Sequence, residues 1–230
     1  PAAAILGYAL GVFDGLKARR ALDGRVLLFR NVDAARRVGR SAEKLLMPAY
    51  DAELLAGHLM ELVRRNLDYV PAAGHGALYL RPMLHCIEPM LGGRPGRAFQ
   101  LLAYASPVGS FFASDDGLKI RAIDQARCPA GGTGDAKATG NYASALATVY
   151  RWRTSGYDDV LFLDSASRTK VAELSGANVF ARLGNGDVVT PALNDEILAG
   201  ITRDSVLTLL RERGVHVAER SLTLEEMLDD

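Results

Sequence analysis

Apolar and polar residues recur with two different spacings along the chain, and the first segment is dominated by strand-like runs. Residues 3–13 are almost entirely apolar, which predicts a strand or a pair of strands. Residues 15–20 and 25–30 flank Asp23-Gly24, a dipeptide typical of a tight hairpin turn. The chain is therefore expected to open with a small antiparallel sheet.

Helical spacing follows two acidic residues that can accept hydrogen bonds from the first turn of a helix. Asp33 precedes a segment that carries three arginines, and Asp51 precedes a segment whose leucines recur every three or four residues. Beyond these two predicted helices, the runs at 77–84 and 99–108 are typical of strands.

The second half of the chain alternates short strands with helices. Residues 118–123 and 159–163 predict strands, and the segment between them predicts a helix that ends near Ser155. The Gly-Asn-Gly sequence at 184–186 supplies the turn of a hairpin. Thr202 is the predicted N-cap of a further helix, after which a last strand and the start of a helix are expected.

Strands and helices in comparable amounts predict an α+β fold. A Gly-, Pro- and Ser-containing stretch at 106–116 is the predicted interdomain loop. It separates a predicted small α/β domain at 1–105 from a predicted larger domain at 117–230.

Composition narrows the class of protein. The 27 basic residues balance the 27 acidic ones, so no net field favours nucleic acid or an anionic membrane. No apolar run approaches the ~20 residues of a membrane span. The two cysteines form no disulfide framework, which favours a cytoplasmic location. The chain begins with Pro1 rather than Met and ends just inside a predicted helix, so we expect the natural protein to be longer.

The most informative stretch is GGTGDAKATGNYA at 131–143, where Lys137 lies among four glycines. Glycine allows positive φ and a close approach of backbone to a bulky ligand. A lysine buried beside such a ligand can stay neutral and form a Schiff base with pyridoxal phosphate. The alternative is a surface turn with a solvated lysine. A phosphate-binding P-loop is excluded because Ala136, not glycine, precedes the lysine.

Three further features are compatible with chemistry, each with a simpler alternative. Gly200-Ile201-Thr202 precedes a helix and could bind a phosphate, or it could be an ordinary capped helix start. Glu173, on a predicted strand, could hold a ring nitrogen or lie in water. The arginines at 36, 37 and 40 could include a phosphate ligand or form a charged helical face. The four histidines show no metal spacing, and no G-x-S-x-G elbow is present.

Taken in order, these segments resemble the branched-chain amino acid aminotransferases, which are fold type IV pyridoxal phosphate enzymes. The resemblance covers nearly the whole chain through GVFDGLKA, LLFR, RRVGRSAEKL, LYLRPML, YASPVG, GGTGDAKATGNYA, ELSGANVF and VVTPALNDEILAGITRDS. It implies a small α/β domain and a larger pseudo-barrel domain joined by a short loop. It also implies a homodimer.

The resemblance further implies a set of cofactor and substrate residues. Lys137 falls on the Schiff-base lysine, Tyr142 on the tyrosine that binds the phenolic oxygen of the cofactor, and Glu173 on the carboxylate at the pyridine nitrogen. The implied phosphate-binding residues are Arg37, Ile201 and Thr202. The implied substrate residues are Tyr8, Phe13, Tyr79 and Arg81, of which the last two would reach across from the dimer partner.

On those residues, the expected activity is pyridoxal phosphate-dependent transamination between an aliphatic, branched-chain L-amino acid and 2-oxoglutarate. An aromatic pocket suits aliphatic side chains, and Arg81 could bind the side-chain carboxylate of glutamate. Gly176-Ala177 and His85-Cys86 depart from the family pattern. A D-amino-acid or amine transaminase, an aminodeoxychorismate lyase and an inactive binding homologue therefore remain alternatives.

Overall fold

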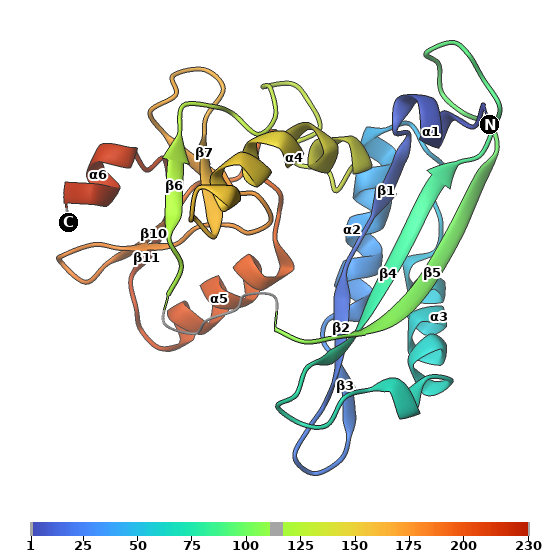
Figure 1. Cartoon of the computed structure of the whole chain (residues 1–230). Coiled ribbons are helices and arrows are strands. Elements are labelled where there is room, and N and C mark those ends of the chain that lie inside the picture. Colours follow the sequence, from blue (N-terminus) through green and yellow to red (C-terminus); the bar gives the residue numbers. More distant parts are fainter. Residues whose placement is uncertain (1, 111–116, 230) are drawn as a thin grey trace. The chain divides into compact units, whose positions relative to one another are not determined.

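The computed structural model describes residues 2–110 and 117–229. Its chain divides into two compact units (Figure 1). The first unit comprises Pro1–Ala113 and Ala136–Gly140, and the second comprises Ser114–Asp135 and Asn141–Asp230. The prediction that all of 117–230 belongs to the second domain is thus wrong for the five residues around Lys137, which pack with the first unit.

The first unit is a five-stranded antiparallel sheet covered on one face by two helices (Figure 1). The strands follow the order β1-β4-β2-β3, with β5 paired to β4. The strand bounds are β1 Gly11–Phe13, β2 Leu16–Arg20, β3 Val26–Leu28, β4 Ala77–Cys86 and β5 Phe99–Val108. The helices are α1 Ala4–Tyr8, α2 Asn31–Lys44, α3 Ala52–Arg64 and the short 3₁₀ helix η1 Leu67–Tyr69.

The core of this unit lies between the sheet and α2. Val12 and Leu84 from the sheet pack against Val38, Ala42 and Met47. Alternate residues of β4 are buried, because successive side chains of a strand point to opposite faces. The even-numbered positions of β4 therefore face the core, whereas Tyr79 and Arg81 lie on the opposite face.

The second unit contains two three-stranded sheets. One has the order β6-β7-β8, with β6 parallel and β8 antiparallel to the fully buried β7. The other has the order β11-β10-β9. The strand bounds are β6 Ile120–Ile123, β7 Asp159–Leu163, β8 Val171–Leu174, β9 Ala181–Arg182, β10 Val188–Thr190 and β11 Val217–Glu219. The helices are α4 Thr139–Thr154, α5 Ile201–Glu212 and α6 Leu224–Asp229.

Most of the predicted elements are present. Gly24 has a φ of +83° in the hairpin between β2 and β3, and the side chain of Asp51 accepts hydrogen bonds from Glu53 N and Leu54 N. Gly186 has a φ of +92° in the hairpin between β9 and β10. The glycine- and aspartate-rich turns were therefore reliable sequence signals.

Four boundaries differ from the prediction. The first apolar run contains the helix α1 before β1, where only strands were expected. Helix α2 begins at Asn31, so Asp33 lies in its first turn and pairs with Arg30 instead of capping it. The N-cap of α5 is Gly200 and not Thr202. The predicted loop at 106–116 begins inside β5, and its residues 111–116 lie outside the described part.

Candidate active site

Lys137 is held by backbone pairing with β1 within the first unit. Ala138 forms an antiparallel bridge with Val12, and Phe13 N donates to Lys137 O at 3.1 Å. Lys137 N in turn donates to Ser41 Oγ on α2 at 2.9 Å. The segment therefore extends the sheet edge, which fixes the side of the sheet on which Lys137 lies.

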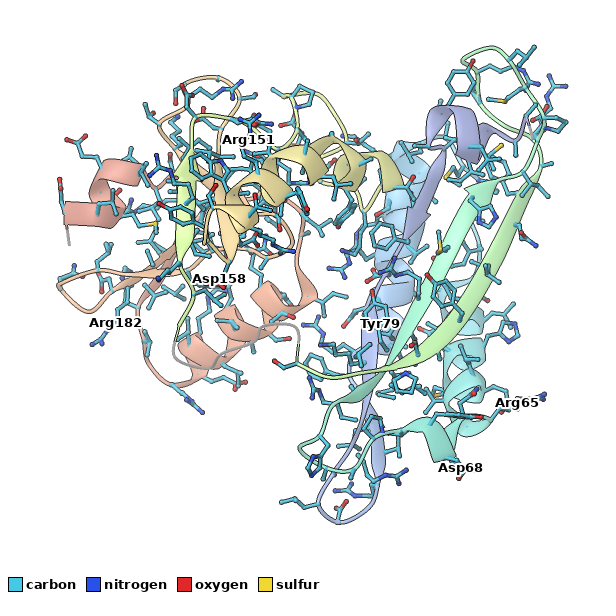
Figure 2. The ribbon with its side chains drawn as sticks, in the orientation of Figure 1. Arg65, Asp68, Tyr79, Arg151, Asp158 and Arg182 are labelled. Atoms are coloured by element: carbon cyan, nitrogen blue, oxygen red, sulfur yellow. The ribbon has the colours of Figure 1, made fainter. Side chains whose placement is uncertain are left out.

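Lys137 shares the face of the sheet opposite the helices with three predicted substrate residues. Its Nζ lies 5.1 Å from the centre of the Phe13 ring, and the Arg81 guanidinium lies 4.4 Å from the same ring centre. Arg81 donates through Nε and Nη2 to Tyr79 Oη, at 3.1 and 2.7 Å. The sheet thus gathers an amine, a guanidinium and two aromatic rings (Tyr79 is labelled in Figure 2).

Gly15 makes room for this arrangement. It lies opposite Arg81 in the β2–β4 register, and a Cβ there would lie 2.1 Å from Tyr79 Oη. The glycine therefore lets the tyrosine lie flat over the strand. Since Tyr79 and Arg81 contact Phe13 and influence Lys137 of their own chain, the prediction that they reach across from a dimer partner is wrong.

The charge balance around Lys137 favours a neutral amine. Burial lowers its pKa from 10.5 to about 8, and the Arg37 and Arg81 guanidinium groups act in the same direction. Asp14 and Tyr79 oppose them but do not offset the burial. A substantial fraction of Lys137 is thus uncharged near neutral pH, as an attacking amine or a proton acceptor must be.

A buried ion pair lies beneath this face, on the side of the helices. Asp14 is fully buried and accepts from Arg37 Nε at 2.8 Å and from Arg37 Nη2 at 2.7 Å. Such a two-point contact fixes the guanidinium plane. Arg37 is therefore an anchor of α2 on the sheet, and its predicted role as a phosphate ligand stays a prediction.

In the second unit, Glu173 is the centre of a buried polar network. Its side chain is 7% exposed and forms an ion pair with Arg127 Nη2 at 2.5 Å. Glu173 Oε2 also accepts from Asn178 Nδ2 at 3.2 Å and from Leu198 N at 3.3 Å. All of these partners are donors, so the surroundings suit a carboxylate and not a carboxylic acid.

Arg127 also ties together the two loops next to Glu173. Its Nη2 donates to Gly134 O at 2.8 Å and to Glu196 O at 3.0 Å. A Cβ on Gly134 would lie 2.6 Å from Glu196 Cα, so the two backbones approach too closely for any side chain. The same guanidinium therefore joins the glycine-rich loop before Lys137 to the strand that carries Glu173.

Helix α5 presents an amino end without a side-chain cap. Its N-cap is Gly200, which has no side chain to accept from the first amides, and Ile201 and Thr202 form its first turn. The first amides of a helix have no partner inside it and lie at the positive end of the helix dipole. Asp204 lies in the same turn and weakens this field. The local geometry is that of an anion-binding helix start.

The two remaining predicted residues have different surroundings. Tyr142 lies in the first turns of α4, where it is partly buried. Tyr8 is 48% exposed, and its hydroxyl donates to Leu91 O at 2.5 Å. Neither is printed among the groups that shift Lys137, so the roles predicted for Tyr8 and Tyr142 stay predictions.

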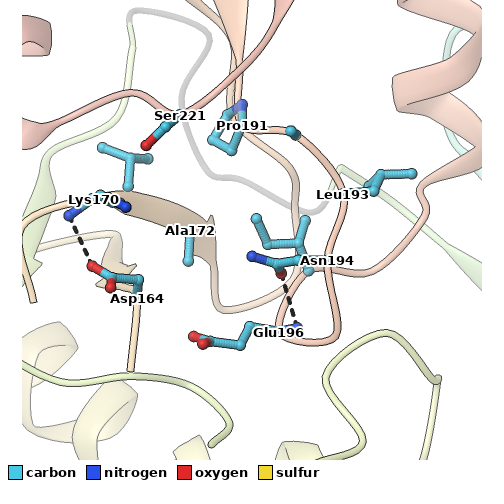
Figure 3. A pocket seen from close by; sticks show the side chains of 11 residues that line it. Asp164, Lys170, Ala172, Pro191, Leu193, Asn194, Glu196 and Ser221 are labelled. Atoms are coloured by element: carbon cyan, nitrogen blue, oxygen red, sulfur yellow. Dashed lines mark hydrogen bonds between the residues drawn. The ribbon is translucent and has the colours of Figure 1, made fainter. Parts of the chain in front are cut away.

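A separate pocket of about 200 Å³ lies on the other side of β8 (Figure 3). It is lined by Ala172 and Pro191, and by polar side chains that include Asp164, Lys170 and Asn194. Neighbouring residues of a strand point to opposite faces, so the pocket at Ala172 and the carboxylate of Glu173 lie on different sides. This pocket is therefore distinct from the Glu173 network.

Sequence reasoning missed Asp14, Arg127 and Asn178. Asp14 stands out only as an acid inside the apolar run that forms β1 and β2. Arg127 precedes the glycine-rich loop and Asn178 follows the small residues after Glu173, within segments already recognised as functional. Their partners are 23 to 69 residues away for the bonds described above, so no local pattern connects them, except that Asn178 follows Glu173 by five.

The fold and these residues define a class of protein. The family described as Amino-transferase class IV matches residues 11–230, so the chain belongs to the class IV aminotransferases. Its fold is confirmed by likeness to a branched-chain aminotransferase of Thermoproteus uzoniensis, with a TM-score of 0.85 and 31% identity over 97% of this chain and 73% of that one. A branched-chain amino acid aminotransferase of Escherichia coli gives 0.86 and 26% over 97% and 72%.

Relatives by sequence carry related names. A branched-chain-amino-acid transaminase of Bacillus subtilis is 39% identical over 99% of this chain and 64% of its own length. A mitochondrial branched-chain amino acid aminotransferase of Humulus lupulus is 39% identical over 100% and 58%. A methionine aminotransferase of Arabidopsis thaliana is 37% identical. The chain thus spans about three fifths of the length of these relatives.

Within the described residues, no helix has both the length and the apolar character needed to cross a membrane. The same part of the chain contains no group of three or more His, Cys, Asp or Glu side chains that could hold a metal ion.

Proposed function

We propose that this protein transfers the amino group of a branched-chain L-amino acid to 2-oxoglutarate, with pyridoxal phosphate as its cofactor. The observation that carries the proposal is Lys137, an amine with a pKa lowered to about 8 in a chain of the class IV aminotransferase family. Solved relatives include a Thermobaculum terrenum enzyme described in its PLP form and a Thermus enzyme with pyridoxamine 5'-phosphate.

The donor set fits this cofactor in three places. The aldehyde requires a neutral amine, which the surroundings of Lys137 favour. The pyridine nitrogen requires a carboxylate, which the ion pair with Arg127 maintains at Glu173. The phosphate requires backbone donors, which the uncapped start of α5 at Ile201 and Thr202 supplies. We propose that Tyr142 and Arg37 complete the set.

When bound, pyridoxal phosphate supplies an electron sink that stabilises the carbanion formed at the α-carbon of the amino acid. The residues do the rest. Lys137, through its uncharged Nζ, accepts the α-proton and returns it during the opposite half of the reaction. Glu173 holds a proton at the ring nitrogen, and the buried Arg127 prevents that carboxylate from losing its charge.

Substrate selection is assigned to the face around Lys137. The rings of Phe13 and Tyr79 offer apolar surface to an aliphatic side chain, and the Arg81 guanidinium between them offers a partner for a carboxylate. One methylene changes discrimination by only ~1–3 kcal/mol in such a pocket, so leucine, isoleucine and valine are all expected to react. We propose that Tyr8 contributes to the pocket in a homodimer.

A cytoplasmic location is part of the proposal, although the names of relatives include mitochondrial and chloroplastic proteins. The balanced charge gives no reason to invoke nucleic acid as a partner.

The test is an absorption spectrum of the purified protein with pyridoxal phosphate, followed by a panel of amino donors with 2-oxoglutarate. Leucine, isoleucine and valine should change the spectrum and yield glutamate. Methionine tests a second specificity, since one relative bears that name. Exclusive reaction with D-alanine or a simple amine would contradict the substrate class, and no cofactor absorbance would support an inactive homologue.

A further inference from the structure

Asn178 occupies a position that connects Glu173 to the turn before α5. Its Nδ2 donates to Glu173 Oε2 at 3.2 Å and to Leu198 O at 2.9 Å. Leu198 N donates to the same Glu173 oxygen at 3.3 Å. A side-chain amide has two N–H groups, so both of its bonds can exist together. The three groups therefore form a closed ring of hydrogen bonds.

The other end of the Asn178 amide lies against Gly200. A Cβ on Gly200 would lie 2.1 Å from Asn178 Oδ1, so the amide oxygen occupies the space that a side chain would take. Gly200 is also the N-cap of α5. The Asn178 side chain thus contacts both the carboxylate of Glu173 and the residue that starts the helix.

A second anchor limits the movement of the helix itself. Arg203, in the first turn of α5, is 4% exposed, forms an ion pair with Glu219 at 3.0 Å and donates to Pro191 O at 2.9 Å. Because β10 and β11 hold the helix from that side, the turn at 198–200 is the segment through which a shift at Glu173 can reach the amino end of α5.

We infer that Asn178 is a positioning residue that couples the carboxylate of Glu173 to the anion-binding end of α5. The inference rests on the proposed function, in which these two places hold opposite ends of one cofactor. Occupation of one place orders the amide of Asn178, so less ordering remains to be done when the other is occupied. Coupling between sites is reciprocal and has a typical size of 5–150-fold in affinity.

The experiment compares pyridoxal phosphate with pyridoxal, which lacks the phosphate. Dissociation constants of both are measured for the cofactor-free protein, and their ratio reports the contribution of the phosphate. In the natural sequence, Glu173→Gln should lower this ratio by about tenfold, since the two ends are coupled. With Asn178→Ala in place, Glu173→Gln should leave the ratio unchanged. Asn178→Asp, which replaces the donor by an oxygen, should behave like Asn178→Ala.

Two controls separate coupling from simple loss of structure. Asn185→Ala removes an asparagine of the exposed β9–β10 turn and should preserve the tenfold effect. Gly200→Ala displaces the amide without removing it and should abolish the effect, which decides the matter if the Asn178 variants do not fold.

The outcomes are distinguishable from a failure of the proposed function. If the natural sequence binds neither compound, the proposed cofactor is wrong and the inference falls with it. If it binds pyridoxal phosphate and Glu173→Gln still changes the ratio tenfold in the Asn178→Ala and Gly200→Ala variants, the coupling through Asn178 is refuted while the function stands.

Discussion

The surroundings of Lys137 in the first unit and of Glu173 in the second place charged groups in opposite situations. Lys137 is held by backbone pairing, and its ammonium form is disfavoured by burial and by two neighbouring guanidinium groups. Glu173 is held by side chains, and each described contact of its carboxylate comes from a donor. The first region is therefore prepared for reaction, whereas the second is prepared for binding.

This difference has a physical consequence for stability. A buried ion pair is strongly destabilised when one partner is removed, because the other charge is left without compensation. A buried amine that resists its charge should instead become a stabilising position when the amine is replaced. Substitutions in the two regions are thus expected to differ in sign.

The largest effect is expected at the amine. Lys137→Ala should reduce transamination by at least about 10³-fold, because both the attacking group and the proton acceptor are lost. The initial rate with leucine and 2-oxoglutarate measures this. Lys119→Ala serves as the matched control, since it removes a lysine at an exposed position of the second unit. Equal losses in both variants would contradict a special role for Lys137.

The second prediction concerns the ring nitrogen. Glu173→Gln should leave pyridoxal phosphate bound but lower kcat by about 10²-fold, since a ring nitrogen without its proton is a poor electron sink. Absorbance of the bound cofactor and kcat are measured on the same sample. A variant that keeps the kcat of the natural sequence would assign Glu173 a structural role only.

The third prediction tests the ion pair itself. Arg127→Met should lower the free energy of unfolding by about 3–5 kcal/mol, because it leaves Glu173 buried without its guanidinium. The double variant Arg127→Met with Glu173→Leu should recover most of that loss. Denaturant unfolding of the cofactor-free protein measures both. Arg25→Met is the control, since its pair with Asp23 is exposed and should contribute less than about 1 kcal/mol.

The smallest effect has the opposite sign and depends on pH. The folded chain loses the proton of Lys137 near pH 8, whereas the unfolded chain keeps it up to about pH 10.5. Between these values the unfolded state binds more protons, so stability rises with pH. Lys137→Met should therefore stabilise the cofactor-free protein by about 1–3 kcal/mol at pH 7, and this gain should vanish by pH 10.5. A gain that does not change with pH would contradict a buried, charge-resistant amine.

How far the sequence predicts the molecule also differs between the two regions. Turns that need glycine or an aspartate cap, as at Gly24 and Asp51, are local and were predicted correctly. The packing of residues 136–140 with the first unit could not be predicted, because their partners Val12 and Ser41 are about a hundred residues away along the chain. The helix α1 was missed because its five residues show too little periodicity to be told from a strand.

The site itself was predicted through resemblance and not through physics. Lys137 was singled out by its glycines, but its lowered pKa depends on Phe13, Arg37 and Arg81, which only the folded sheet brings together. Asn178 and Arg127 bond to backbone atoms such as Leu198 O and Gly134 O. Contacts of that kind leave no residue pattern, which is why neither residue was found.

The central claim is that Lys137 is the residue that carries the cofactor. Borohydride reduction of the protein with pyridoxal phosphate fixes the cofactor on the amine that holds it, and peptide mass mapping then locates the added mass. We predict that the mass appears on the peptide containing Lys137 and that labelling increases as the pH rises through about 8. A label on Lys119 or Lys170, or no specific label, would contradict the account.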